Sequence, residues 1–192
     1  MLPFIDLQAQ YKENQNAIDE HIQDVLDSSQ YIMGDKVEKL EQQLGNFVDA
    51  EHAIGVGSGT DALLLALMAH DIGPGDEVIT TPFTFISTAE VIALLRAKPV
   101  FVDIKEDTYN IDPEMVADAI TENTKAILPV DLFGQCADYD RLEQISEDHG
   151  IPLIEDAAQS FGATQNGKEA GGFGQVGCAS FYPAKPLGCY GD

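Results

Sequence analysis

Hydrophobic residues recur at helical spacing in the first part of the chain. One stripe lies within residues 12–30 and a second within residues 36–49, and Gly34 separates them. The stripes are formed by Ile18, Ile22, Val25 and Leu26, and by Val37, Leu40, Leu44, Phe47 and Val48. Apolar residues every three or four positions predict two amphipathic helices. Such faces pack in a core or, in an oligomer, on a partner.

From residue 53 onward the pattern changes, and short β-branched runs alternate with amphipathic segments. We expect strands at 53–56, 77–80, 100–102, 126–130, 151–154 and 176–181. We expect helices at 62–69, 83–95 and 138–149, and one that begins after Asp112 as N-cap with Pro113 in its first position. Strands that alternate with helices predict an α/β fold of three layers, α/β/α, around a mostly parallel sheet.

Composition and charge narrow the functional classes. The chain has 192 residues, 44% of them hydrophobic, which is enough to form a core. The chain has 10 Lys and Arg and 33 Asp and Glu, which give a net charge of −23. Nucleic acid is therefore not an expected partner, because phosphate contacts need clustered cations. An acidic membrane surface would also repel the chain, and a solvated acidic surface is the simpler interpretation of the charge.

Other sequence signals exclude several sites and compartments. The three cysteines contain no CxxC pair, and no histidine has a second ligand at metal-binding spacing, so neither a disulfide framework nor a metal site is expected. The N-terminus lacks the pattern of a signal peptide, and no apolar run reaches the ~20 residues of a membrane helix. We expect a cytoplasmic protein.

In parallel sheets, ligands bind at the carboxyl ends of strands, so the residues that follow each strand carry the candidate chemistry. Gly57-Ser58-Gly59-Thr60 follows the first expected strand and opens a helix. The segment is typical of a phosphate cradle, and equally of a tight turn with a capping hydroxyl. A dinucleotide fingerprint is disfavoured, because Thr60 stands at the third glycine position and Asp76 and Glu77 open a strand instead of closing one.

Three further strand ends carry an acid, an aromatic ring and a lysine. Asp156 ends an apolar run and needs a cationic partner, which a protonated pyridine nitrogen would supply; an N-cap or a structural ion pair is the alternative. Phe85 fits either a core position or stacking on a flat ring. Lys185 lies among prolines with no acid nearby until Asp192, so it is either a solvated lysine or a covalent anchor for a carbonyl group.

Taken together, a phosphate cradle, a stacking ring, an acid and an isolated lysine describe one cofactor, pyridoxal 5′-phosphate (PLP). With these residues the chain resembles the PLP-dependent sugar-nucleotide aminotransferases of the DegT/DnrJ group, which have fold type I. The resemblance extends over the whole chain. It rests on Phe4-Ile5-Asp6-Leu7, Tyr31-Ile32-Met33-Gly34, Gly57-Ser58-Gly59-Thr60-Asp61-Ala62-Leu63, Gly73-Pro74-Gly75-Asp76-Glu77-Val78-Ile79, Thr81-Pro82-Phe83-Thr84-Phe85, Gly134-Gln135, Glu155-Asp156-Ala157-Ala158-Gln159-Ser160 and Ser180-Phe181-Tyr182-Pro183-Ala184-Lys185-Pro186-Leu187-Gly188.

The resemblance implies a role for each matching residue. Lys185 corresponds to the lysine that binds the cofactor covalently, and Asp156 to the acid that pairs with the pyridine nitrogen. Gln159 corresponds to the contact with the ring hydroxyl and Phe85 to the stacked aromatic. The phosphate ligands correspond to Gly59, Thr60 and Ser180.

The resemblance also implies a reaction and a domain organisation. We expect transamination of a nucleotide-linked keto sugar by an amino acid donor, L-glutamate, in the biosynthesis of bacterial surface polysaccharides or amino sugars. The similarity is greatest to enzymes that aminate a UDP-3-keto-N-acetylhexosaminuronic acid. We expect an N-terminal helical segment (1–30) and an incomplete PLP-binding large domain (31–192), without the small C-terminal domain, in a protein that is a homodimer at full length. An inactive regulator or scaffold, or a fragment inactive by itself, is the alternative.

Overall fold

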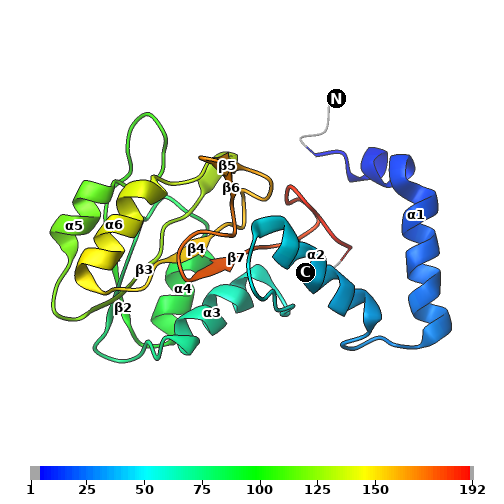
Figure 1. Cartoon of the computed structure of the whole chain (residues 1–192), viewed down its shortest axis with the longest axis horizontal. Coiled ribbons are helices and arrows are strands. Elements are labelled where there is room, and N and C mark those ends of the chain that lie inside the picture. The colour runs from blue at the N-terminus through cyan, green and yellow to red at the C-terminus, as the bar shows by residue number, and fades with distance from the viewer. Residues whose placement is uncertain (1–4, 191–192) are drawn as a thin grey trace. The chain divides into compact units, whose positions relative to one another are not determined.

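A computed structural model of the chain describes residues 5–190, so Phe4 and Asp192, which the sequence argument used, lie outside it. The chain divides after Gly55 into two compact units, which are described separately (Figure 1). The predicted border between residues 30 and 31 falls in the loop between the first two helices. That border remains a prediction.

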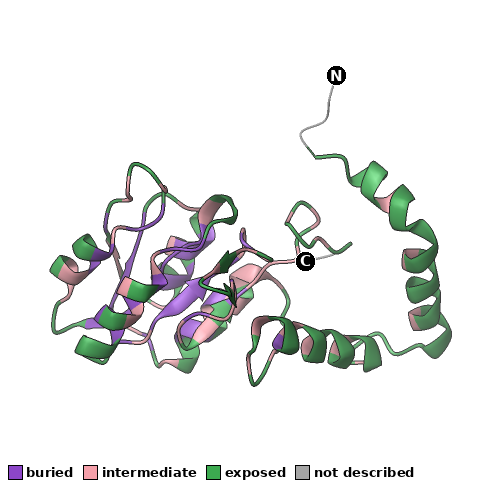
Figure 2. Ribbon diagram, turned by 45° about the horizontal axis from the view of Figure 1, so that its top comes forward, coloured by how far each residue is buried: buried purple, intermediate pink, exposed green. Residues whose placement is uncertain are grey.

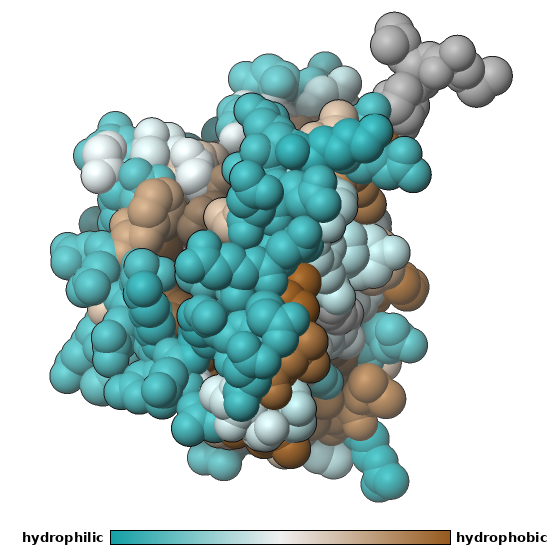
Figure 3. All heavy atoms as spheres, turned by 90° about the vertical axis from the view of Figure 1, so that its right-hand side faces the viewer, coloured by the Kyte–Doolittle hydropathy of each residue, from teal (hydrophilic) through white to brown (hydrophobic). Residues whose placement is uncertain are grey.

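The first unit contains the two predicted helices, α1 (Leu7–Ser28) and α2 (Asp35–Val48). The Asp6 carboxylate caps α1 by accepting a hydrogen bond of 2.9 Å from the Ala9 amide. No residue of α1 is buried, as the exposed colouring of this helix in Figure 2 shows. Figure 3, which has α1 toward the viewer, shows hydrophilic side chains over most of it and hydrophobic ones along one edge. Within residues 5–190, no helix is both long enough and apolar enough to cross a membrane.

The second unit is built on parallel strands, as predicted. β1 (Glu77–Thr80) lies between β2 (Lys98–Phe101) and β3 (Thr124–Ile127), and β4 (Ile154–Asp156) pairs with β7 (Val176–Cys178). All of these pairings are parallel. Single bridges between Ile127 and Leu153 and between Val130 and Asp156 connect β3 to β4. The strands therefore follow the order β2-β1-β3-β4-β7.

Helices cover both faces of these strands. Successive strand residues point to opposite faces, and the buried side chains divide accordingly into two clusters. Ile79, Ile127 and Leu153 pack with α5 (Pro113–Ala119) and α6 (Tyr139–His149). Their sequence neighbours Val78, Ala126 and Ile154 pack with α3 (Gly59–Ala69) and α4 (Ile86–Leu94). The predicted three-layer α/β/α architecture is confirmed, and in Figure 2 the buried residues concentrate on the strands and the helix sides that face them.

Local signals placed several element ends correctly. Asp112 caps α5 through its side chain and Pro113 occupies the first turn, as predicted. Asp138 caps α6, and Gly150 ends it in the left-handed conformation at φ 65°. Other predicted bounds shift by a few residues: α3 begins at Gly59 instead of 62, and α4 at Ile86 instead of 83.

The predicted strand at 53–56 was wrong. The segment forms no strand, and the side chain of Ile54 is 79% exposed. The amide of Gly55 donates instead to the Glu41 carboxylate at 2.6 Å. A β-branched run becomes a strand only beside a pairing partner, and none lies next to it in the described part of the chain.

The structure also contains a hairpin that we did not predict. β5 (Thr164–Gln165) and β6 (Lys168–Glu169) are antiparallel and joined by Asn166-Gly167. Both turn residues have positive φ, 53° and 81°, as a type I′ turn requires. The Asn-Gly pair was the available signal, but its flanking strands have only two residues each.

Candidate active site

Asp156 is the last residue of β4 and is only 4% exposed. Each carboxylate oxygen has one donor. The Thr88 hydroxyl donates to Oδ2 at 2.9 Å, and the Ala158 amide donates to Oδ1 at 3.2 Å. Thr88 lies on α4, whereas Ala158 lies in the turn that follows β4. Two separate elements thus orient this carboxyl group.

Burial raises the pKa of the Asp156 carboxyl group. Desolvation raises the pKa of Asp156, whereas the hydrogen bonds from Thr88 and Ala158 and the positive charge of Lys185 act to lower it. The net direction is upward, so these favourable interactions do not fully offset the loss of water. A cation at the free side of the carboxyl group would restore its ionised form, and a protonated pyridine nitrogen fits that requirement.

Lys185 lies in the loop after β7 and acts on Asp156 electrostatically. Its amide donates to the Tyr182 carbonyl at 2.8 Å, and the Cys189 amide donates to the Phe181 carbonyl at 2.7 Å. These two bonds fold the Pro-rich loop back on itself around a half-buried lysine. Lys185 and Asp156, which the sequence analysis selected from different strand ends, therefore interact through their charges.

The N-terminus of α3 lies against the loop after β7. Ser58 caps the helix through a 3.1 Å hydrogen bond from the Asp61 amide, and Gly59 and Thr60 are the first two helical residues. Amides in this position have no acceptor within their own helix, and they favour an anion. A Cβ on Gly59 would lie 2.6 Å from the Ser180 Cβ. Gly59, Thr60 and Ser180 therefore lie together, and the close approach explains why glycine occupies position 59.

The two remaining predicted residues, Phe85 and Gln159, lie close in sequence to Thr88 and Asp156. Phe85 directly precedes α4, and its side chain is 65% exposed. Phe85 directly precedes the first turn of α4, and Thr88 in that turn donates to Asp156. Gln159 is half-buried in the turn after β4, and its carbonyl oxygen is 3.9 Å from the Cβ position of Gly134. Phe85 was predicted in the loop between a strand and a helix, and it lies there, as the residue before α4.

Sequence analysis missed a pair of buried acids near Asp156. Asp131 and Glu155 are fully buried and hydrogen-bonded to each other. Asp131 also accepts from the Tyr139 hydroxyl at 2.9 Å and from the Ala137 amide at 2.8 Å. Glu155 accepts from the amides of Gly171 and Phe173 at 2.6 and 2.8 Å.

Desolvation raises the pKa of Asp131 to about 6 and that of Glu155 to about 9. Burial thus raises the pKa of both acids, and that of Glu155 by more. An acid directly after the Val130 strand end was the only sequence hint of this pair.

Three exposed aromatic rings were missed as well. Phe83, Tyr109 and Phe133 contact one another with centroid distances of 5.8, 6.2 and 6.1 Å. They come from the loops that follow β1, β2 and β3. Tyr109 and Phe133 have positive φ, 62° and 59°, which is uncommon for aromatic residues. No spacing along the sequence relates these residues, because only the parallel strands bring their loops together.

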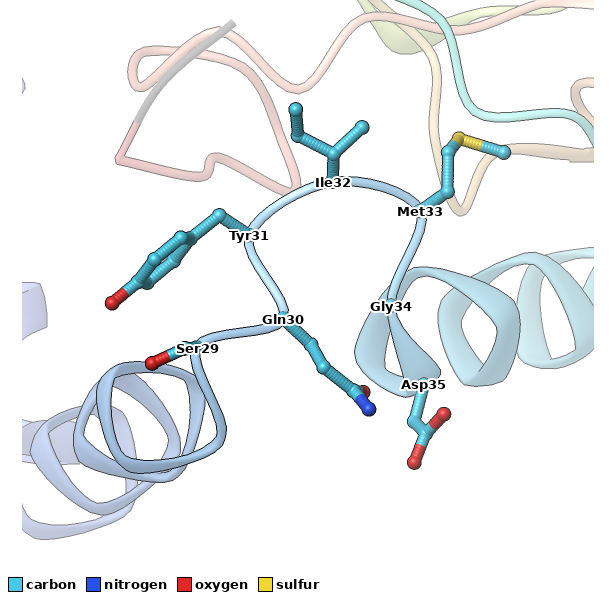
Figure 4. Close-up of a pocket in the computed structure, with 7 residues that line it drawn as sticks. All are labelled: Ser29, Gln30, Tyr31, Ile32, Met33, Gly34 and Asp35. Carbon is cyan, nitrogen blue, oxygen red and sulfur yellow. The ribbon is translucent and has the colours of Figure 1, made fainter.

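The loop between α1 and α2, residues 29–35, surrounds a separate, open hollow in the first unit (Figure 4). The side chains of Tyr31, Ile32 and Met33 fan outward from it and are 64%, 86% and 73% exposed. None of the predicted site residues lines this hollow.

Residues 12–192 match the model of the DegT/DnrJ/EryC1/StrS aminotransferase family. The chain belongs to this family. It is 54% identical to the UDP-2-acetamido-2-deoxy-3-oxo-D-glucuronate aminotransferase of Pseudomonas aeruginosa, over 100% of this chain and 54% of that protein. The chain thus spans about half the length of the curated relatives it matches.

Solved structures share the fold of this chain. DesV from S. venezuelae, in complex with a ketimine intermediate, is 43% identical with a TM-score of 0.94; the match covers 100% of this chain and 52% of that one. NtdA from Bacillus subtilis, with bound cofactor PMP, is 32% identical with a TM-score of 0.89, over 99% of this chain and 43% of that one. The expected family and the fold-type-I architecture are confirmed.

Substituting Gly59 tests the close approach at the cradle. In Gly59→Ala, the new methyl group meets Ser180, and we expect a loss of about 1–3 kcal/mol in unfolding free energy, measured by urea denaturation. Gly73→Ala is the matched control, because no atom lies within 4 Å of a Cβ there. Adding Ser180→Gly to Gly59→Ala should recover most of the loss; no recovery would contradict the proposed contact.

The buried acids predict that stability falls as the pH rises. Asp131 and Glu155 keep a proton in the folded protein at pH values where the unfolded chain has released it. Their contribution is full below the ordinary carboxyl pKa and is lost as pH rises through about 6 for Asp131 and about 9 for Glu155. A loss on the order of 2 kcal/mol between about pH 6 and about pH 9 corresponds to a fall of about 4–8 °C in melting temperature.

Glu155→Gln should flatten this pH dependence, because an amide keeps a donor toward Asp131 and cannot ionise. Glu143→Gln changes an exposed acid that pairs with Lys168 and should leave the dependence as it is. Equal slopes for Glu155→Gln and the unmodified protein would rule out Glu155 as the source.

Proposed function

We propose that this chain is the cofactor-binding part of a PLP-dependent aminotransferase that aminates a nucleotide-linked keto sugar. The observation that carries the proposal is the buried acid Asp156 with the charge of Lys185 acting on it, within a chain of the DegT/DnrJ/EryC1/StrS family. The similarity to an enzyme named for a UDP-linked 3-oxo sugar supports this substrate class.

The proposed roles follow from the local chemistry of each residue. Asp156 would hold a proton on the pyridine nitrogen, and Lys185 would form the covalent bond to the cofactor. The amides of Gly59 and Thr60, with the Ser180 hydroxyl, would bind the phosphate. Phe85 would stack on the ring and Gln159 would contact its hydroxyl group. The bound cofactor supplies an electron sink for the carbon that loses its proton.

Lys185 would have a second role once it is released from the cofactor. A lysine amine is a competent base when its pKa is lowered, and a half-buried loop next to a short apolar strand limits its hydration. It would move the proton between the donor carbon and the cofactor. L-glutamate is the proposed amino donor.

The charge of the chain restricts how the substrate binds. A nucleotide-linked sugar carries a diphosphate, whereas the chain has a net charge of −23. Long-range attraction is therefore unfavourable, and the diphosphate requires cations placed locally. Arg141 is already engaged with Glu114 at 2.7 Å. We infer that recognition of the diphosphate depends on few, closely positioned groups.

The proposal extends to the assembly and setting of the protein. A cytoplasmic homodimer in bacterial amino-sugar or surface-polysaccharide biosynthesis is consistent with the family and with the substrate of the Pseudomonas relative. The proposed organisation keeps an N-terminal helical segment, 1–30, beside the cofactor-binding domain, 31–192.

Borohydride reduction tests the covalent role of Lys185. After incubation with PLP, reduction should attach the cofactor to the peptide that contains Lys185, as detected by mass spectrometry. Lys185→Ala should abolish this labelling, whereas Lys125→Ala, which changes an exposed lysine on β3, should retain it. Labelling that persists in Lys185→Ala would refute the assignment.

The two half-reactions test the proposed activity. With L-glutamate, the PLP-loaded protein should release 2-oxoglutarate and lose the visible absorbance of its cofactor. A UDP-linked 3-keto sugar should then restore that absorbance. A protein that binds PLP at Lys185 but performs neither half-reaction with any keto-sugar nucleotide would favour the alternatives, an inactive regulator or scaffold or a fragment that is inactive by itself.

A further inference from the structure

We propose that Thr88 is a positioning residue for Asp156 and that Thr84 fixes the direction of the Thr88 hydroxyl bond. The inference deepens the proposed function, because it concerns the acid assigned to the pyridine nitrogen. It stands on two distances. The Thr88 Oγ1 lies 2.9 Å from the Asp156 Oδ2 and 2.9 Å from the Thr84 Oγ1.

The single proton of each threonine hydroxyl determines which group donates in the two hydrogen bonds of Thr88. A threonine hydroxyl has a single proton to donate. When Thr88 gives its proton to the Asp156 carboxylate, the remaining contact requires Thr84 to donate to Thr88. The relay then runs from half-buried Thr84, through fully buried Thr88, to Asp156. Hydrogen bonds in series polarise one another, which strengthens the last bond to the carboxylate.

The position of Thr88 makes this bond rigid. Thr88 is 0% exposed and lies on α4, which buries Val91 and Ile92 against the core. A β-branched side chain on a helix has few χ1 rotamers, so its hydroxyl group has little freedom to turn away. With the Ala158 amide on the other oxygen, the plane of the carboxyl group is held from two sides. Its remaining lone pairs are then available to a cationic ring.

Several other charged or titratable groups surround Asp156, and substitution of Thr88 leaves them unchanged. Burial raises the pKa of Asp156, and the positive charge of Lys185 partly opposes that rise. The negative charge of Asp156 raises the pKa of Asp131 and of the Cys178 thiol, and Glu155 precedes Asp156 on β4. A changed titration of Asp156 in a Thr88 variant is therefore attributable to the lost hydroxyl bond.

Thr88→Val tests the inference, because it keeps the shape and removes the donor. NMR titration of the Asp156 carboxyl carbon in cofactor-free protein should give a pKa about one unit higher than in the unmodified protein. PLP should bind on the order of tenfold to a hundredfold more weakly, as expected for a lost hydrogen bond to a charged group. Thr88→Ser restores a hydroxyl and should recover most of both properties.

Two further variants separate positioning from packing. Thr80→Val removes another fully buried hydroxyl, one that donates to the Leu128 carbonyl at 2.7 Å. It should affect melting temperature but neither the Asp156 pKa nor PLP affinity. Thr84→Val leaves the buried Thr88–Asp156 bond in place and should shift both properties in the same direction as Thr88→Val, by less.

An unchanged Asp156 pKa in Thr88→Val would overturn the inference, as would equal shifts in Thr80→Val. Failure of the unmodified protein to bind PLP would instead overturn the proposed function. In that case the NMR titration alone decides whether Thr88 positions Asp156.

Discussion

The burial of acidic side chains at the end of β4 is the constraint around which the second unit is arranged. Glu155 is fully buried and Asp156 nearly so, and a carboxylate in such a place loses most of its hydration. Each oxygen of both residues accepts from a donor supplied by another element or by the following turn. Helix α4, the turn after β4 and the loop between β6 and β7 are therefore held to each other by the need to satisfy these acids. Without those donors, the pKa values of Glu155 and Asp156 would be higher still.

The fold was largely predictable where the signals are local. Glu77–Thr80 was assigned to its full extent because a Gly-Pro-Gly-Asp turn precedes it and a proline follows it closely. The caps at Asp112 and Asp138 act within one helical turn. Residues 53–56 have the composition of a strand, but they pair with no strand in the described part of the chain. The residues of a segment do not by themselves show whether a pairing partner will lie beside it. The hairpin at 164–169 depends on a two-residue turn between strands too short to show alternation.

The residues of the candidate site also divide into those that local sequence signals reveal and those that depend on contacts between distant segments. Asp156 and Lys185 could be selected because they lie at or after a strand end and stand out from their surroundings. Gly59 was selected from its Gly-Ser-Gly-Thr segment, although the strand expected before that segment does not form. Thr88 and Asp131 could not, because their importance lies in what they contact across the sheet. Thr88 reads as an ordinary first-turn residue of a helix until its hydroxyl is found 2.9 Å from Asp156. Polar residues that support an active site are thus less visible in a sequence than those that perform the chemistry.

The approach of Gly59 to Ser180 bears on how the protein is made. Gly59 lies near the start of the second unit and Ser180 follows much later in the chain, so one side of the cradle is synthesised long before the other. The N-terminus of α3 can form early on the ribosome, but it meets its counterpart only after β4 and β7 have paired. Bringing such distant segments together is entropically slow. A phosphate held between Gly59 and Ser180 would therefore select chains in which β4 and β7 have paired, and cofactor supply would influence the yield of folded protein more than the speed of its early folding.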